Sequence, residues 1–167
     1  MPFGKVETLV VGSDRYYTGI ADDYEIEERT LNGRLLRLIR IDLSQELIDS
    51  DRRDAFITEK VEGMSEVARS LEEPALRAIS TAIPAPAYTQ LLLDDRGRLW
   101  VRGFGYETEP QVWHLLDRRG RWLGDVETPP GIDVLEVGGD YVLGRATDAL
   151  DVHSILLFAL IDAVEGN

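Results

Sequence analysis

The sequence contains no cysteine among its 167 residues, which excludes disulfide bonds, thiolate catalysis and cysteine-ligated zinc. Histidine is almost as scarce. His114 and His153 are the only two, and neither has a second histidine at the short spacing of a zinc motif. Asparagine occurs only at Asn32 and Asn167. The residue types that most often ligate a transition metal are therefore nearly missing.

A long apolar run is also missing. The segment 155–161 is too short to span a bilayer, and the first five residues are not followed by an apolar stretch of signal-peptide length. We therefore expect a cytoplasmic protein as the chain stands, and a periplasmic or secreted one if the chain is a piece of a longer protein.

Basic residues are in deficit. Eighteen lysines and arginines face thirty-one acidic residues, so the net charge is -13, which repels nucleic acid and anionic membranes. Neither is expected as a partner. Arg145 is the only basic residue between Pro130 and Asn167, where seven acidic residues occur. Such an acidic segment forms a solvated surface or faces a cation or a basic partner.

The composition predicts one folded domain over residues 1–167, because 44% of the residues are hydrophobic and a chain of this length buries a sizeable core. Residues 6–42 hold four β-type runs at 7–11, 16–20, 24–31 and 35–41, typical of an antiparallel meander. Asn32 and Gly33 predict a two-residue hairpin turn between the last two runs.

The apolar period changes in residues 44–82. Apolar side chains recur there with helical spacing, and we expect Gly63 and Pro74 to break the helix into pieces. The β pattern then returns over residues 87–128 and 132–162, which gives about eleven strands in all. The helical stripe consists of Ile57, Val61, Met64, Ala68, Leu71 and Ala75.

Short stretches of the sequence repeat. The stretch from Val10 to Gly19 recurs from Glu136 to Gly144 with one residue deleted, and the turn Asn32-Gly33-Arg34 recurs as Arg119-Gly120-Arg121. Without the helical segment, the repeat has a period of about 43 residues, which fits the blades of a β-propeller. The fold expected is mainly β, with four-stranded antiparallel blades and a helical insertion.

The similarity to propeller blades is clearest in the stretches Leu91–Val101 and Leu115–Gly124. There the sequence resembles a six-bladed β-propeller of the NHL or TolB-like kind. About three blades are present, whereas a closed ring needs at least about four. We therefore expect a homodimer that completes the ring. A capped fragment of a longer propeller and an α+β sandwich or barrel are the alternatives.

The resemblance also implies candidate chemistry. Some propellers of this kind are calcium-dependent lactonases or related hydrolases, whose metal is held by carboxylates and asparagines. The two asparagines here do not supply that set, so we expect no cofactor, with calcium bound by carboxylates as the alternative. The residues proposed for that alternative are Asp140, Asp148 and Asp151.

Aromatic and imidazole side chains are the other candidates. Stacking rings bind sugars and bases, but they also fill the space between blades. The ligand-binding residues expected are Trp100, Trp113, His114, Trp122 and His153.

Three functions stay open. The favoured one is a non-enzymatic binding or scaffold protein for a protein or a small molecule, because no nucleophile elbow, P-loop or dinucleotide fingerprint is present. The second is a calcium-assisted, lactonase-like hydrolase. The third is a carrier for a small apolar ligand, with a pocket between the helix and a sheet lined by Trp100, Trp113 and Leu92.

Overall fold

The structure is a computed structural model that describes residues 6–81, 83–106 and 108–161. These residues form thirteen strands and two helices, and every strand pairing is antiparallel. The expected mainly β fold with a helical insertion is confirmed. None of the four sheets closes into a barrel within the described residues. The expected helical and third β segments end at residues 82 and 162, which lie outside the described residues.

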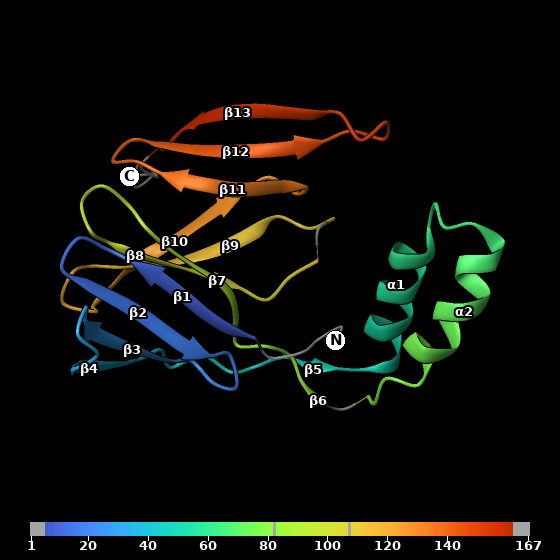
Figure 1. The fold of residues 1–167 in the computed structure, drawn as a ribbon, viewed down its shortest axis with the longest axis horizontal. Coiled ribbons are helices and arrows are strands. Elements are labelled where there is room, and N and C mark those ends of the chain that lie inside the picture. Colours follow the sequence, from blue (N-terminus) through green and yellow to red (C-terminus); the bar gives the residue numbers. More distant parts are fainter. Residues whose placement is uncertain (1–5, 82, 107, 162–167) are drawn as a thin grey trace, which may run out of the picture.

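The first sheet is a four-stranded meander near the N-terminus, drawn in blue in Figure 1. Neighbouring strands are consecutive in the sequence and are joined by short turns, as the alternation of β-type runs and turn residues predicts. Its strands are β1 (Glu7–Val11), β2 (Arg15–Ile20), β3 (Glu25–Thr30) and β4 (Leu35–Arg40).

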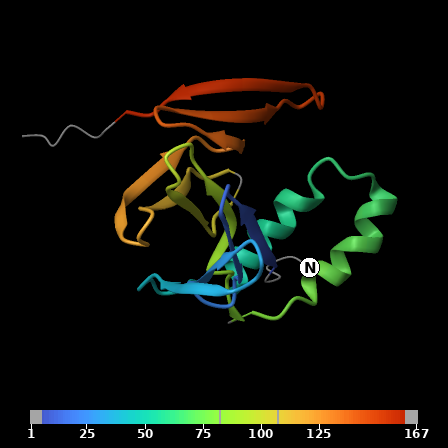
Figure 2. The ribbon, with the colours of Figure 1, turned by 60° about the vertical axis from the view of Figure 1, so that its left-hand side comes forward.

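The second sheet is also a four-stranded meander and lies between the other two (Figures 1 and 2). Its inner strands are the most buried of the chain, because the sheet packs a core on each face. Its strands are β7 (Tyr88–Leu93), β8 (Leu99–Gly103), β9 (Gln111–Leu116) and β10 (Trp122–Thr128).

The third sheet has three strands, one fewer than the other two. It lies along the other side of the second sheet (Figure 1). Its strands are β11 (Ile132–Val137), β12 (Tyr141–Thr147) and β13 (His153–Ala159). The first strand of the middle sheet, β7, contacts both β1 and β11, so the first strands of all three sheets gather on one side of the stack.

Two separate cores hold the stack together. Between the first and second sheets, Ile26, Tyr88 and Val101 are at most 1% exposed. Between the second and third sheets, Trp100 and Trp113 are each 1% exposed and their rings meet edge to face at 6.3 Å. Aromatic side chains of this size bury more apolar area than other side chains do.

The helical insertion stands beside one edge of the stack (Figures 1 and 2). It holds α1 (Ser50–Val61) and α2 (Glu66–Arg77) between two short strands, β5 (Leu47–Ile48) and β6 (Ile83–Pro84), which pair with each other. These two strands raise the count from the expected eleven to thirteen.

The two expected helix breaks have different outcomes. Gly63 lies between the helices with a φ of +80°, as predicted. Pro74 lies inside α2 without ending it, so that prediction is wrong. The ion pair of Glu73 and Arg77, at 2.8 Å, spans the proline, and the adjacent Leu76 is buried. These contacts offset the hydrogen bond that proline removes.

The turn at Asn32 and Gly33 also differs from the prediction. Only Gly33 has a positive φ, at +87°, and the Thr30 N–H donates to the carbonyl of Arg34 while the Thr30 carbonyl accepts the N–H of Gly33. The turn is therefore a longer hairpin loop that ends with a left-handed glycine, a common alternative to the two-residue turn.

The same loop recurs in all three sheets, with a side-chain oxygen at its first position. That oxygen accepts the amide N–H four residues later, and the aspartates also accept the amide two residues later. The fourth position takes a positive φ. The repeat of Asn32-Gly33-Arg34 as Arg119-Gly120-Arg121 thus reflects one turn geometry, which begins at Thr30, Asp94, Asp117 and Asp148.

Candidate functional site

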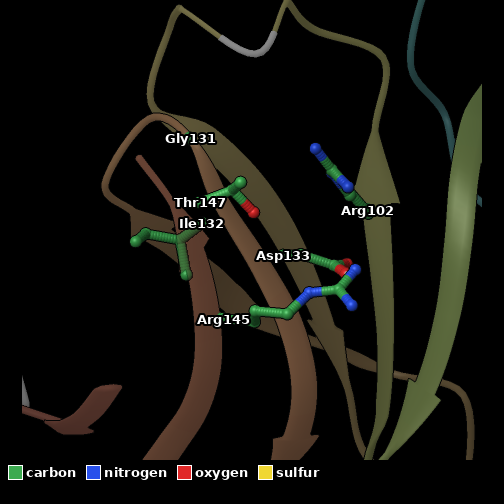
Figure 3. Close-up of a pocket in the computed structure, with 6 residues that line it drawn as sticks. All are labelled: Arg102, Gly131, Ile132, Asp133, Arg145 and Thr147. Atoms are coloured by element: carbon green, nitrogen blue, oxygen red, sulfur yellow. The ribbon is translucent and has the colours of Figure 1, made fainter. Parts of the chain in front are cut away.

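A cleft of about 450 Å³ lies where the second and third sheets end beside each other. Figure 3 shows Asp133 and Arg145 from the third sheet directed toward the strand that carries Arg102. Volumes of this size are typical of small-molecule sites. The cleft is lined by Arg102, Gly131, Ile132, Asp133, Arg145 and Thr147.

Arg145 and Asp133 form an ion pair on the wall that belongs to the third sheet. They are cross-strand partners of β12 and β11, and Nη2 of Arg145 donates to Oδ2 of Asp133 across 2.7 Å. Their side chains are 43% and 46% exposed. Because both reach water, the pair orients the guanidinium group at little energetic gain.

Arg102 comes from β8 and is held by a buried amide. Its Nε and Nη2 donate to Oε1 of Gln111 at 3.0 and 2.8 Å. Gln111 is 2% exposed, and its Nε2 donates to the backbone carbonyls of Tyr106 and Glu109. One buried glutamine thus fixes both the loop before β9 and the direction of the Arg102 guanidinium.

Thr147 adds a hydroxyl at the end of β12. Its Oγ1 lies 3.0 Å from Nδ1 of His153, its cross-strand partner on β13. The tautomer of His153 decides whether Thr147 donates or accepts in this contact. The imidazole therefore controls which way the hydroxyl hydrogen points.

The chemistry of the cleft follows from these groups. Two guanidinium groups and a hydroxyl face it from two sheets, and each is held by a neighbour within its own sheet. Guanidinium groups match the geometry of carboxylates and phosphates and bind them through paired N–H donors. The arrangement suits an anion that carries several oxygen atoms.

Two of the five expected ligand-binding residues lie in the core. Nε1 of Trp100 donates to Oδ2 of Asp94 at 3.1 Å, and Nε1 of Trp113 donates to Oγ1 of Thr128 at 3.3 Å. At 1% exposure, both indoles fill the space between the second and third sheets. That is the structural role weighed against binding in the sequence.

Two others lie on the opposite face of the second sheet. Nδ1 of His114 is 2.9 Å from Oδ1 of Asp125, and the His114 ring lies 5.0 Å from Trp122 and 6.3 Å from Tyr24. Trp122 is 43% exposed. The fifth residue, His153, lies beside the cleft through its contact with Thr147. The five residues therefore occupy three places instead of one.

The residues expected to line a pocket under the helix do not lie there. Trp100, Trp113 and Leu92 belong to the core between the second and third sheets. A separate hollow of about 600 Å³ lies between α1 and the loop before β9, where the Tyr106 hydroxyl donates to the carbonyl of Arg52 across 3.2 Å. Charged residues predominate in its lining.

The three candidate calcium ligands lie in turns, with Asp140 exposed between β11 and β12 and Asp148 and Asp151 between β12 and β13. Oδ1 of Asp148 accepts the amides of Leu150 and Val152 at 2.8 and 3.0 Å. Asp151 occupies the left-handed position of the same turn, with a φ of +59°. Within residues 6–81, 83–106 and 108–161, no group of three or more histidine, cysteine or acidic side chains is placed to hold a metal ion.

Sequence reasoning did not select Arg102, Arg145 or Thr147 as site residues. One clue was present, because Arg145 is the single basic residue of an acidic segment, and a charge that departs from its surroundings marks a specific contact. Nothing comparable marks Arg102, since arginines are frequent around it. Its role depends on the packing of the second sheet beside the third, which spacing alone does not predict.

No helix among the described residues is both long and apolar enough to cross a membrane. A scan against protein-family models found no match, and a search of curated proteins found no relative.

Proposed function

We propose that the protein is a non-enzymatic binding protein of β-propeller type, which holds a small carboxylate- or phosphate-bearing anion in the cleft between Arg102 and Arg145. The observation that carries this proposal is the convergence of these two arginines and Thr147 on one cleft. In a protein with a net charge of -13, an anion needs such a local basic site to overcome the repulsion of the remaining surface.

The propeller type is supported by the arrangement of the sheets. Each is a meander, and β7 contacts the first strands of both neighbouring sheets. Blades are related in this way around a propeller axis. The cleft lies at the ends of β8 and β12, the second strand of the second and third sheets, near the start of β11.

Binding is favoured over catalysis by the surroundings of the Thr147 hydroxyl. A catalytic threonine needs a base that a third group orients. His153, the neighbour of Thr147, is exposed, which does not suit a base held in one orientation. We expect modest affinity, in the millimolar to high micromolar range, because the incoming anion competes with Asp133 for Arg145.

The test is a titration of ¹⁵N-labelled protein with citrate and, separately, with inorganic phosphate, followed by NMR. We expect shifts confined to the amides around Gly131, Asp133 and Thr147. Substitution of Arg145→Gln or Arg102→Gln should weaken binding about tenfold, the value of one charge-assisted hydrogen bond.

The matched control is Arg77→Gln on α2, which removes an exposed arginine that is also paired with an acid. It should leave the affinity unchanged. The proposal fails if neither anion shifts these amides at millimolar concentration. It also fails if the Arg77 variant weakens binding as much as the cleft variants, since the effect would then be that of net charge.

A further inference from the structure

Two sheet faces at opposite ends of the stack expose rows of large apolar side chains. Both faces belong to sheets whose other side is packed on the second sheet. Scattered apolar residues are normal on a surface, but contiguous ones mark an interaction site. The exposed side chains are Leu9, Val11, Ile20 and Leu38 on the first sheet and Leu135, Ile155 and Leu157 on the third, and their exposed fractions range from 38% to 69%.

Strand alternation places these rows on the outer faces. On β13, Leu156 and Phe158 pack into the core, so Ile155 and Leu157 point away from it. On β1, Val10 packs against the first core, and its neighbours Leu9 and Val11 point outward. The exposed rows are therefore the reverse sides of the two packed faces.

Cross-strand pairing joins the outward side chains of neighbouring strands on each outer face. Leu9 pairs with Thr18, Thr18 with Glu27, and Glu27 with Leu38, so one row crosses all four strands of the first sheet. On the third sheet Leu143 pairs with Leu157. The outer face of the first sheet is therefore apolar along β1 and β4 and carries Thr18 and Glu27 between them.

We propose that the outer face of the first sheet packs on the outer face of the third sheet of a second copy, and that the reciprocal contact closes two chains into a ring of six sheets. Within one chain, β7 already lies between β1 and β11. If the first strands of neighbouring sheets keep this arrangement across the contact between two copies, β11 of one copy lies beside β1 of the other. Two such contacts satisfy a two-fold axis and leave no sheet face open.

The exposed area is consistent with this assembly. The chain exposes 10594 Å², whereas a compact monomer of its mass exposes about 8300 Å². The helical pair, which stands beside the stack, contributes part of this excess. A stable dimer buries about 1200–2000 Å² in total, or about 600–1000 Å² from each chain, which the two outer faces would have to supply.

The charges of the two faces also permit close packing. On the first sheet Arg29 pairs with Glu27 and Arg40 pairs with Glu25. On the third sheet Arg145 pairs with Asp133, at the end of the outer face that also borders the cleft. The other carboxylates of the two faces, Glu7 and Glu136, accept hydrogen bonds from the hydroxyls of Thr18 and Tyr141, so the contact would bury them with a neutral partner, at a cost that the apolar side chains have to outweigh.

The test combines solution mass with a charge exchange. Light scattering of the wild type should give a dimer of twice 18.8 kDa. Leu9→Lys on β1 and Leu135→Glu on β11 should each raise the dimer dissociation constant at least about tenfold, because a charge would face an apolar partner. Mixing the two variants should restore the dimer, since one interface becomes Lys against Glu and the other stays wild type.

The control is Leu71→Glu on α2, which alters a side chain that is 74% exposed and lies on neither face. It should remain dimeric. Circular dichroism of each variant separates lost association from lost folding. A wild type that stays monomeric at hundreds of micromolar overturns the proposal. So does a Leu9→Lys variant that stays dimeric while Leu135→Glu dissociates, because like faces would then be paired.

Discussion

The indole Nε1 of Trp100 donates to Oδ2 of Asp94 at 3.1 Å. This bond ties the turn between β7 and β8 to the core between the second and third sheets. The same carboxylate accepts the amides of Arg96 and Arg98 and the Nε of Arg98, so four donors depend on one buried side chain.

Asp94→Ala should therefore lower the free energy of unfolding by about 2–4 kcal/mol, since it leaves the buried Trp100 N–H without its partner. Urea denaturation measures the loss. Asp117→Ala is the matched control, because Asp117 begins the same kind of turn but accepts no indole and is more exposed. Its loss should be clearly smaller. Equal losses would show that the turn alone matters.

Glu28 provides a second test, of a buried ion-pair cluster within the first sheet. Its side chain is 1% exposed and pairs with Arg15 and with Arg37, the latter at 3.3 Å. Glu28→Gln keeps the shape and removes the charge. We expect a loss of about 2–3 kcal/mol, less than for a fully buried pair because both guanidinium groups reach water.

Glu27→Gln is the control for Glu28, because it changes the adjacent carboxylate, which is one third exposed and pairs with Arg29. It should alter the urea midpoint little. If the two variants lose equal stability, the burial of Glu28 does not set the strength of its contacts.

Tryptophan fluorescence tests the placement of the aromatic residues. Trp122 is 43% exposed, whereas Trp100 and Trp113 are 1% exposed. Acrylamide should therefore quench mainly the emission of Trp122, and Trp122→Phe should remove most of the quenchable signal. Trp113→Phe should leave the quenchable part intact. The opposite result would place Trp113 in an open site, as the sequence-based expectation allowed.

The pH dependence of stability follows from three carboxylates at turns and sheet surfaces. The backbone N–H of Arg121 lowers the pKa of Asp117, and hydrogen bonds from Arg15 and Arg29 lower the pKa values of Asp14 and Glu27. A carboxyl whose pKa is lower in the folded state stabilises the fold above its unfolded value. That contribution disappears as the pH falls through the folded value.

The urea midpoint should accordingly be stable near neutral pH and fall below about pH 4. Asp117→Asn should be less stable than wild type at pH 7, and the two curves should converge in acid, where the wild-type carboxyl is also neutral. A constant difference between them at all pH values would mean that the charge of Asp117 is not involved.

The strands were largely predictable from the sequence, because alternation and turn residues are local properties. The run at 7–11 coincides with β1, and the runs at 16–20 and 35–41 differ from β2 and β4 by one residue each. The path of α2 through Pro74 was not predictable, since the burial of Leu76 in the turn that follows is a tertiary property and tertiary context overrides local propensity. Asn32-Gly33 failed similarly, because the hydroxyl of Thr30 stabilises a longer loop.

The candidate site was much less predictable. Asp148 and Asp151 suggested calcium, yet a carboxylate that caps a turn and one that binds a metal are alike in sequence. Arg102 and Arg145 lie 43 residues apart in different sheets, and they share a cleft only because the sheets stack. Of the five aromatic and imidazole candidates, His153 alone lies beside it.

Chemical cross-linking tests the ring of two copies most directly, because the chain contains no cysteine. A variant with both Leu9→Cys and Leu135→Cys, treated with a short bis-maleimide, should give a covalent dimer and nothing larger. Each single variant should stay uncross-linked, since its cysteines lie on separate interfaces. Cross-linked single variants, a ladder of larger products, or no product from the double variant would contradict the closed two-copy ring.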